Sequence, residues 1–297
     1  MTDFRGSYTV MVTPFDAAGR VDEQRLRRFV DWQIDEGVHG LIPLGSTGEF
    51  LSLTRDERRT VGAVVVEQAA GRVPVLVGTA AEWTDEAVAL AKEAESYGAD
   101  GVMIVPPYYS SPSPDEIFEH YRRIGEAISL PVMLYNNPFT ANVDLKPPLV
   151  ARLSRIDNVS YIKESSGSVA RTSDIIRLCG DRMTVFAGYH PWEGYLVGAK
   201  GYVSVFSNIA PALSSEMFVE TVDKRDAEAG RAIYDKVMPL LDALAGDLYV
   251  SATKAALKMI GMPMGDPRAP RLPLPAEKLD PLREVLTDLG LIKARAA

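Results

Sequence analysis

Cysteine is almost absent from this chain of 297 residues, and long apolar runs are missing altogether. Cys179 is the single cysteine, so no intrachain disulfide can form and a four-cysteine zinc site is excluded. No apolar run approaches the roughly 20 residues of a membrane-spanning helix, and the first residues lack the basic start and apolar stretch of a signal peptide. We therefore expect a cytoplasmic protein that does not bind membranes.

Clustered positive charge is also lacking. The chain has 32 Lys and Arg residues against 40 Asp and Glu residues, which gives a net charge of -8. No basic run is present that could follow a phosphate backbone, so nucleic acid is not an expected partner. The hydrophobic fraction of 46% is that of a globular protein with a sizeable core.

Short β-branched runs alternate with amphipathic segments about every 30 residues, which indicates successive βα units around a parallel sheet. The strand candidates are residues 8–13, 40–44, 73–77, 101–105, 132–135, 159–163, 184–187 and 201–205. An open doubly wound sheet is the main alternative, but its Gly-x-Gly-x-x-Gly fingerprint is absent after the first strand. The pattern predicts a closed (β/α)8 TIM barrel.

Beyond the last strand candidate the pattern is purely helical. Helices are predicted at about 226–244, 248–260 and 280–289, the last behind a proline-rich stretch at 263–275. We expect residues 1–225 to form the barrel with the active site, and residues 226–297 to form a helical extension packed on the outside of the barrel.

Barrel enzymes hold their sites at the carboxyl ends of the strands, which directs attention to Lys163 in the sixth strand candidate. Removal of a lysine from water favours its neutral amine, and a neutral amine attacks a ketone to form an imine. The alternative is a structural lysine whose ammonium pairs with Glu164 or another carboxylate near the rim.

Two neighbouring strand ends carry further candidates. Tyr135 ends the fifth strand candidate, where a phenol could move protons to and from a carbinolamine; it could equally be a core tyrosine with a hydrogen-bonded tip. The turn Gly45-Ser46-Thr47-Gly48-Glu49 follows the second strand candidate, and its N–H groups and hydroxyls suit a carboxylate. That turn could instead be a helix start, or a phosphate loop that lacks the usual lysine.

With these motifs the chain resembles the dihydrodipicolinate synthase and N-acetylneuraminate lyase superfamily of pyruvate-type class I aldolases, nearly from end to end. The matching segments are Val12 to Phe15, Gly45 to Glu49, Pro106 to Tyr109, Tyr135 to Pro138, Ile162 to Glu164, Gly188, Gly201 to Ser204, Lys254 to Lys258 and Leu272 to Leu274.

The resemblance implies a catalytic set. Lys163 would form the Schiff base and Tyr135 would transfer protons. Ser46 would relay the proton, together with Tyr109 from a neighbouring subunit. No metal or organic cofactor is implied, since the imine is itself the electron sink. Because Tyr109 would come from a neighbouring subunit, the resemblance also implies a homo-oligomer, either a dimer or a tetramer.

The resemblance also implies a binding set, and here the sequence departs from the family. The ligand carboxylate would be held by Thr47 and the serine before it, with the backbone of Gly188 and Val203 beside the keto acid. The synthase of lysine biosynthesis carries an arginine that grips the carboxylate of its aldehyde substrate, where this chain has neutral Thr140. The sialic acid lyase has two acids after its seventh strand, where this chain has His190 and a proline.

His190 would then bind a substrate hydroxyl or act as an acid or base, or simply be a surface or helix-capping residue. Ser165, Ser166, Asn137 and Ser207 indicate a polar pocket, although serine in such loops is often turn chemistry.

We therefore predict a lyase that cleaves, condenses or dehydrates pyruvate or another 2-keto acid through an imine at Lys163. A 2-keto-3-deoxy sugar acid is favoured as its substrate. The alternative is the 4-hydroxy-tetrahydrodipicolinate synthase reaction, which Thr140 disfavours unless another arginine, with Arg171 as a remote candidate, replaces the missing one.

Two further alternatives belong to other classes. A metal-dependent aldolase would need clustered ligands, but His39, His120 and His190 fall at a strand start, in a helix and after a strand. A non-catalytic keto-acid sensor would show a degraded site, yet Lys163 and Tyr135 are both present.

Overall fold

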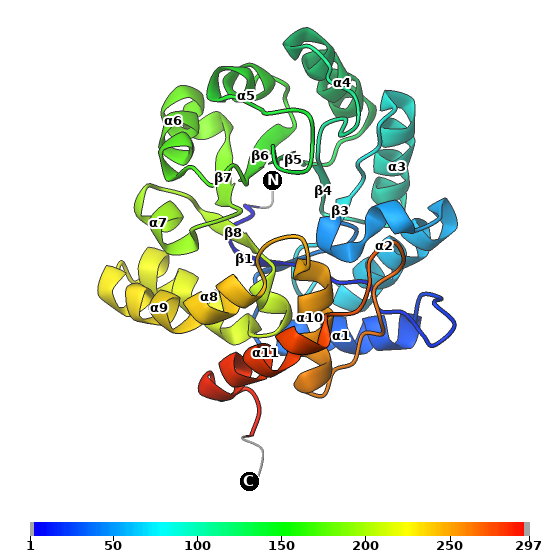
Figure 1. The fold of residues 1–297 in the computed structure, drawn as a ribbon. Coiled ribbons are helices and arrows are strands. Elements are labelled where there is room, and N and C mark those ends of the chain that lie inside the picture. The colour runs from blue at the N-terminus through cyan, green and yellow to red at the C-terminus, as the bar shows by residue number, and fades with distance from the viewer. Residues whose placement is uncertain (1–2, 294–297) are drawn as a thin grey trace.

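Eight parallel strands form the centre of the molecule in the computed structural model, which describes residues 3–293 (Figure 1). The strands are β1 (Gly6–Val10), β2 (Gly40–Ile42), β3 (Leu76–Gly78), β4 (Gly101–Ile104), β5 (Val132–Asn136), β6 (Val159–Glu164), β7 (Thr184–Ala187) and β8 (Gly201–Ser204). The predicted (β/α)8 barrel is confirmed, with strand bounds that differ by up to three residues from those expected.

The strands pair in the order β2-β1-β8-β7-β6-β5-β4-β3. The ring closes between β2 and β3 through a single bridge from Leu41 to Val75, beside which Leu41 N donates to Pro74 O at 3.0 Å. Because all these pairs are parallel, the carboxyl ends of the strands meet at one rim.

Helices surround this ring (Figure 1). They are α1 (Glu23–Asp35), α2 (Arg55–Ala69), α3 (Thr84–Ser96), α4 (Pro114–Ala127), α5 (Pro147–Leu153), α6 (Val169–Cys179), α7 (Pro191–Leu196) and α8 (Pro211–Phe218). A capping box opens α2: the Thr54 side chain accepts from Glu57 N, and the Glu57 carboxylate accepts from Thr54 N. Within residues 3–293, no helix is both long enough and apolar enough to cross a membrane.

Aromatic side chains fill the amino-terminal half of the barrel. The rings of Tyr8 and Phe186 meet edge-on with their centroids 5.2 Å apart, and both side chains are fully buried. Each ring lies against a strand-opening glycine, Tyr8 against Gly40 and Phe186 against Gly201, where any Cβ would collide with it. The barrel is therefore plugged at this end, and in barrel enzymes a ligand binds at the opposite, carboxyl rim.

The C-terminal segment adds α9 (Ala227–Ala243), α10 (Tyr249–Met259) and α11 (Ala276–Asp288). The predicted helices are present, although α11 begins before residue 280. Helix α9 packs against α7 and α8, and α11 packs against α9 and α10. The division of the chain at residue 226 stays a prediction.

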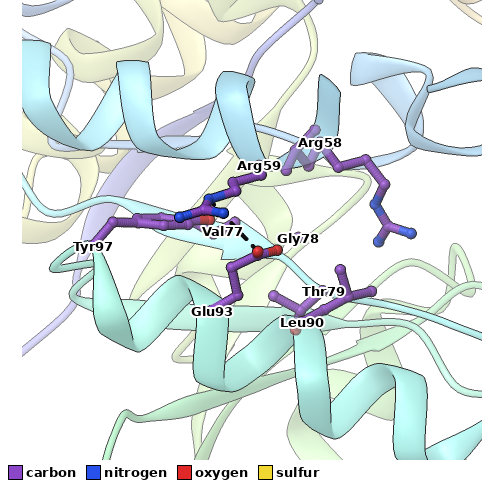
Figure 2. Close-up of a pocket in the computed structure, with 9 residues that line it drawn as sticks. Arg58, Arg59, Val77, Gly78, Thr79, Leu90, Glu93 and Tyr97 are labelled. Carbon is purple, nitrogen blue, oxygen red and sulfur yellow. Dashed lines mark ion pairs between the residues drawn. The ribbon is translucent and has the colours of Figure 1, made fainter. Parts of the chain in front are cut away.

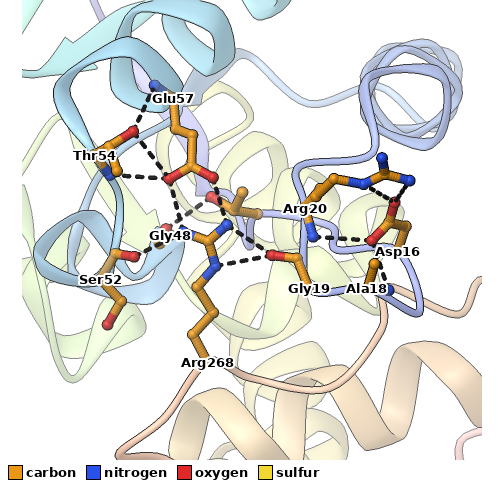
Figure 3. Close-up of polar contacts among 10 residues, drawn as sticks. Asp16, Ala18, Gly19, Arg20, Gly48, Ser52, Thr54, Glu57 and Arg268 are labelled. Carbon is orange, nitrogen blue, oxygen red and sulfur yellow. Dashed lines mark hydrogen bonds and ion pairs between the residues drawn. The ribbon is translucent and has the colours of Figure 1, made fainter.

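Arg268, between α10 and α11, fastens this segment to the barrel loops (Figure 3). Its guanidinium pairs with the Glu57 carboxylate of α2 and donates to Ser52 O at 2.8 Å and Gly19 O at 2.7 Å. The C-terminal segment is thus fixed beside the loops that follow β1 and β2.

Candidate active site

A cavity of about 740 Å³ lies at the carboxyl rim of the barrel. It is large enough for a small organic substrate. The predicted site residues that line it are Ser46, Thr47, Tyr135, Thr140, Lys163, Gly188, His190 and Val203. Tyr109 does not line the cavity of its own chain and is 84% exposed.

Lys163 lies on β6, directly opposite Tyr135 of β5 in the strand register. Its side chain is buried, with 5% of the residue exposed, and its Nζ lies 4.1 Å from the centre of the Tyr135 ring. Lys163 Nζ forms no hydrogen bond or ion pair with any residue between 3 and 293. Its amine is therefore turned into the cavity with no protein acceptor to hold it.

The carboxylate of Glu164 is engaged elsewhere. It accepts from Asn136 Nδ2 at 3.0 Å and from Ser166 N at 2.6 Å. The alternative in which Lys163 is a structural lysine paired with Glu164 is therefore wrong. Ser166 contributes to this contact and does not line the cavity.

Arg171, the remote candidate for a substrate-binding cation, is also engaged. Its guanidinium forms an ion pair with Asp144, which also lies 3.3 Å from the Asn136 amide. Arg171 does not line the cavity. It holds the loop after β5 against α6 and is not placed to meet a ligand.

Tyr135 is buried, and its Oη accepts a hydrogen bond from Asn137 Nδ2 at 2.8 Å. The phenol O–H itself therefore stays free to donate. Two buried polar atoms of the cavity wall, Asn137 Oδ1 and Ser165 Oγ, have no hydrogen-bond partner within residues 3–293. A buried polar atom without a partner is destabilising unless a ligand or water satisfies it.

Gly188 follows β7 and packs directly on the Ser165 side chain, so closely that any Cβ would collide with Ser165 Oγ. Its N–H donates to Glu164 O at 2.8 Å. The absence of a side chain at this position lets the end of β7 approach the cavity wall. Ser207, in contrast, donates to Ser204 O and does not line the cavity.

The turn after β2 has an unusual backbone. Leu44 and Glu49 bound it with φ of 62° and 57°, in the left-handed region, and residues Ser46–Gly48 form the 3-10 helix η1. Thr13 Oγ1 donates to Gly48 O at 2.7 Å and ties the turn to the segment that follows β1. The first N–H groups of such a helix have no acceptor within it, so Ser46 and Thr47 suit an anion.

A buried ion pair between Glu49 and Lys254 holds this turn against α10. Lys254 Nζ of α10 lies 2.7 Å from Glu49 Oε1, and Glu49 Oε2 accepts from Arg268 N at 2.9 Å. Burial lowers the pKa of Lys254, and the Glu49 charge opposes that fall. Lys254 also lies 4.1 Å above the Phe15 ring. This second buried lysine is therefore held by a carboxylate, whereas Lys163 is not.

His190 lies at the mouth of the cavity, exposed, with φ of 51°. It occupies the N-cap position of α7, although its side chain makes no capping hydrogen bond. His120 is buried in α4 beside Thr84, and burial lowers its pKa to about 4. In the part of the chain that the structure describes, no three His, Cys, Asp or Glu side chains gather as a metal site requires.

A second cavity lies outside the barrel, between α2, α3 and the end of β3 (Figure 2). Arg58, Arg59, Glu93 and Tyr97 line it, and Arg59 Nε lies 3.7 Å from Glu93 Oε1. Its volume of about 10 Å³ is no more than one water molecule requires. A keto acid does not fit in this second cavity, whereas the cavity at the rim is large enough for one.

The sequence profile of the dihydrodipicolinate synthetase family matches residues 3–289. The chain belongs to this family. Among curated members it is 37% identical over 291 residues to the 4-hydroxy-tetrahydrodipicolinate synthase of Syntrophus aciditrophicus, which covers 97% of this chain and 99% of that one. It is 38% identical over 289 residues to the synthase of the same name from Pseudomonas aeruginosa, with 97% and 99% covered.

Solved structures agree with this family assignment. The chloride-inhibited dihydrodipicolinate synthase of Acinetobacter baumannii, in complex with pyruvate, superposes with a TM-score of 0.94 at 35% identity over 97% of this chain and 99% of that one. A monomeric dihydrodipicolinate synthase variant gives a TM-score of 0.93 at 33% identity over 97% and 98%. The chain is accordingly an enzyme, a lyase of the class I aldolase type. The names of these family members favour the biosynthetic synthase over the sugar-acid lyase that we expected first.

This dihydrodipicolinate synthetase family member also has cavity residues that sequence reasoning missed. Tyr249 and Arg271 line the cavity, although both belong to the segment expected to pack outside the barrel. Phe139 and Tyr189 are exposed at the mouth, with ring centroids 6.3 Å apart in an edge-on contact. No motif marks any of the four residues.

Proposed function

We propose that this enzyme adds pyruvate to an aldehyde through an imine at Lys163 and forms 4-hydroxy-tetrahydrodipicolinate. The structure of this product identifies the aldehyde substrate. Three of its carbons come from pyruvate, and the others come from an amino acid that ends in an aldehyde, aspartate 4-semialdehyde. The observation that carries the proposal is the buried Lys163 amine, which lines the cavity without a protein partner and lies against Tyr135. The names of the family members support the choice of product.

In this proposal the neutral Lys163 amine attacks C2 of pyruvate and forms a carbinolamine. Tyr135 donates a proton to the departing hydroxyl, which leaves as water, and the imine remains. Loss of a proton from C3 gives an enamine, whose C3 forms the new carbon-carbon bond with the aldehyde carbon. Attack by water, or by the substrate's own amino group, releases the product and returns the amine to Lys163.

Tyr135 is suited to this role because its oxygen already accepts from Asn137, so its own proton is available. Ser46 would pass protons between Tyr135 and solvent, and Tyr109 of a neighbouring subunit would continue that relay. The pyruvate carboxylate would bind at Ser46 and Thr47, where the N–H groups of η1 begin. No metal or organic cofactor has a place in this sequence of steps.

The backbone around Gly188 and Val203 would form the wall beside the methyl end of the keto acid. Both residues line the cavity, and Gly188 leaves no space behind it for a side chain. Thr140 and His190 would face the second substrate, since both are exposed at the mouth. A steady-state assay with pyruvate and aspartate 4-semialdehyde tests the proposal; turnover that persists in Lys163→Arg would refute it.

A second candidate is a lyase for a 2-keto-3-deoxy sugar acid. It is favoured by the neutral Thr140 and by the unpartnered Asn137 Oδ1 and Ser165 Oγ, which suit the hydroxyls of a sugar chain. Pyruvate release from a 2-keto-3-deoxy sugar acid, with no turnover of aspartate 4-semialdehyde, would establish this candidate in place of the first.

We also propose a cytoplasmic homo-oligomer, a dimer or a tetramer. The loop after β4 is held by Glu82, whose carboxylate accepts from Tyr109 N at 3.0 Å, yet the Tyr109 side chain is 84% exposed. Trp83 and Leu51 nearby in the fold are 65% and 64% exposed. Exposed aromatic and aliphatic side chains of this size favour a protein interface. Light scattering that finds only monomers at assay concentrations would contradict this assembly.

A further inference from the structure

Arg271 is a cation of the cavity wall with no assigned partner. Its guanidinium makes no hydrogen bond or ion pair with any residue from 3 to 293, although Asp242 and Asp247 line the same cavity. Arg171 and Arg268, in contrast, are engaged by Asp144 and Glu57. A partly buried guanidinium without an acceptor suits an anionic ligand.

The backbone around Arg271 is fixed on both sides. Arg271 N donates to Arg268 O at 3.1 Å, and Ser251 Oγ of α10 donates to Leu272 O at 2.6 Å. Arg268 in turn is fastened to α2 and to the loops after β1 and β2 (Figure 3). The position of Arg271 at the cavity is therefore built into the fold and does not depend on a free loop.

Tyr249 connects Arg271 to the rest of the site. Tyr249, Arg271 and Thr47 line the same cavity, and the Tyr249 hydroxyl lies close enough to the Thr47 side chain and to Arg271, Tyr135 and Tyr189 to interact with them electrostatically. Burial raises the pKa of Tyr249, so its phenol is a hydrogen-bond donor at neutral pH. A cation and a neutral donor thus lie next to the turn proposed for the pyruvate carboxylate.

We propose that Arg271, assisted by Tyr249, binds the carboxylate of the second substrate in place of the cation that is absent at Thr140. This inference rests on the proposed function, because it assigns a subsite of the same cavity. It removes the objection that Thr140 raises against a carboxylated aldehyde: the arginine is supplied by the segment between α10 and α11 and not by the loop after β5. The guanidinium fork can hold a carboxylate through two parallel hydrogen bonds.

The first test compares Arg271→Gln and Arg271→Lys with the unaltered enzyme at saturating pyruvate. We expect the KM for aspartate 4-semialdehyde to rise about tenfold or more in Arg271→Gln, and less in Arg271→Lys, as the loss of a charge-assisted pair predicts. The KM for pyruvate and the borohydride-trapped pyruvate adduct at Lys163 should not change. Arg177→Gln is the matched control, since Arg177 is exposed on α6 and pairs with Asp174.

A second test measures binding without turnover. Pyridine-2,6-dicarboxylate and pyridine-2-carboxylate differ by one carboxylate, and calorimetry gives their Kd for the pyruvate-treated enzyme. We expect the enzyme to prefer the dicarboxylate by about tenfold and Arg271→Gln to lose that preference. Tyr249→Phe should weaken it, which keeps the subsite testable if an Arg271 variant folds poorly.

The two proposals fail in different ways. If Arg271→Gln leaves the aldehyde KM and the preference for the dicarboxylate unchanged, or reduces pyruvate trapping as strongly as aldehyde use, the Arg271 subsite is refuted. If pyruvate is not trapped at Lys163 in the unaltered enzyme, the proposed function is refuted. The Kd values of pyridine-2,6-dicarboxylate and pyridine-2-carboxylate then still show whether Arg271 binds an anion.

Discussion

Glu49 and Lys254 form an ion pair from which solvent is almost entirely excluded, with Glu49 Oε1 2.7 Å from Lys254 Nζ. Glu49 closes the turn that carries Ser46 and Thr47, and Lys254 belongs to α10, five residues after Tyr249. The pair therefore joins the proposed carboxylate-binding turn to the helix that completes the cavity.

Breaking this pair should destabilise the protein. Glu49→Gln leaves the Lys254 charge buried without a counter-ion, so the free energy of unfolding should fall by about 3–5 kcal/mol. The double variant Glu49→Gln with Lys254→Met should recover part of the loss, because a methionine can pack on Phe15. The matched control is Asp235→Asn in the exposed pair with Arg231, where about 0–1 kcal/mol is expected. Equal melting temperatures for Glu49→Gln and Asp235→Asn would contradict this account.

Turnover should depend on the Tyr135 hydroxyl more than adduct formation does. Tyr135→Phe removes the proton donor and leaves the Lys163 amine, so kcat should fall by about 10²–10⁴-fold while some pyruvate is still trapped by borohydride. Tyr108→Phe is a suitable control, since its ring also lines the cavity and packs edge-on against Phe50. Full activity in Tyr135→Phe would rule out the assigned role.

Stability should fall in mild acid because of His120. Burial lowers its pKa to about 4 in the folded protein, whereas the unfolded imidazole takes up a proton below pH of about 6.5. As the pH falls from 6.5 towards 4, the unfolded state binds the extra proton and becomes favoured, by an amount on the order of 3 kcal/mol when the shift is complete. His120→Gln should flatten the melting temperature between pH 7 and 4.5, whereas His190→Gln, at an exposed position, should not. Identical pH profiles in the two variants would refute the assignment.

Gly188 should tolerate no side chain. In Gly188→Ala the new Cβ meets Ser165 Oγ and Glu164 O, so either the end of β7 or the cavity wall must move. We expect a lower melting temperature and a higher KM for pyruvate, and partial recovery when Ser165→Gly is added. A Gly188→Ala variant that matches the parent in both measurements would show that β7 does not approach the wall this closely in solution.

Periodicity alone predicted the eight strands and the later helices, because alternation of β-branched runs and amphipathic segments is local. Element ends were less accurate for local reasons. Residues 73–75 were assigned to a strand, but β3 begins at Leu76, after Pro74 and a single-residue bridge at Val75. Helix α11 begins at Ala276, four residues before the expected start at 280, and it contains Pro281 within its first two turns.

The candidate site was predictable where motifs sit at strand ends, as with Lys163, Tyr135 and the turn after β2. Tyr249 and Arg271 could not be predicted in this way. The helical pattern of α10 says which residues share a face, but not that this face meets a turn some 200 residues earlier in the chain. Only the packing of α10 against the barrel rim, fixed by Lys254 and Arg268, brings them to the cavity.

The most direct test of the central claim is borohydride reduction in the presence of pyruvate, followed by mass spectrometry of the peptides. The account predicts one pyruvate-derived adduct, on the peptide with Lys163, and none in Lys163→Arg. It further predicts that Lys254 stays unmodified, because Glu49 holds its ammonium. A protein that is not modified at all, or is modified at Lys254 while Lys163 stays free, would contradict it.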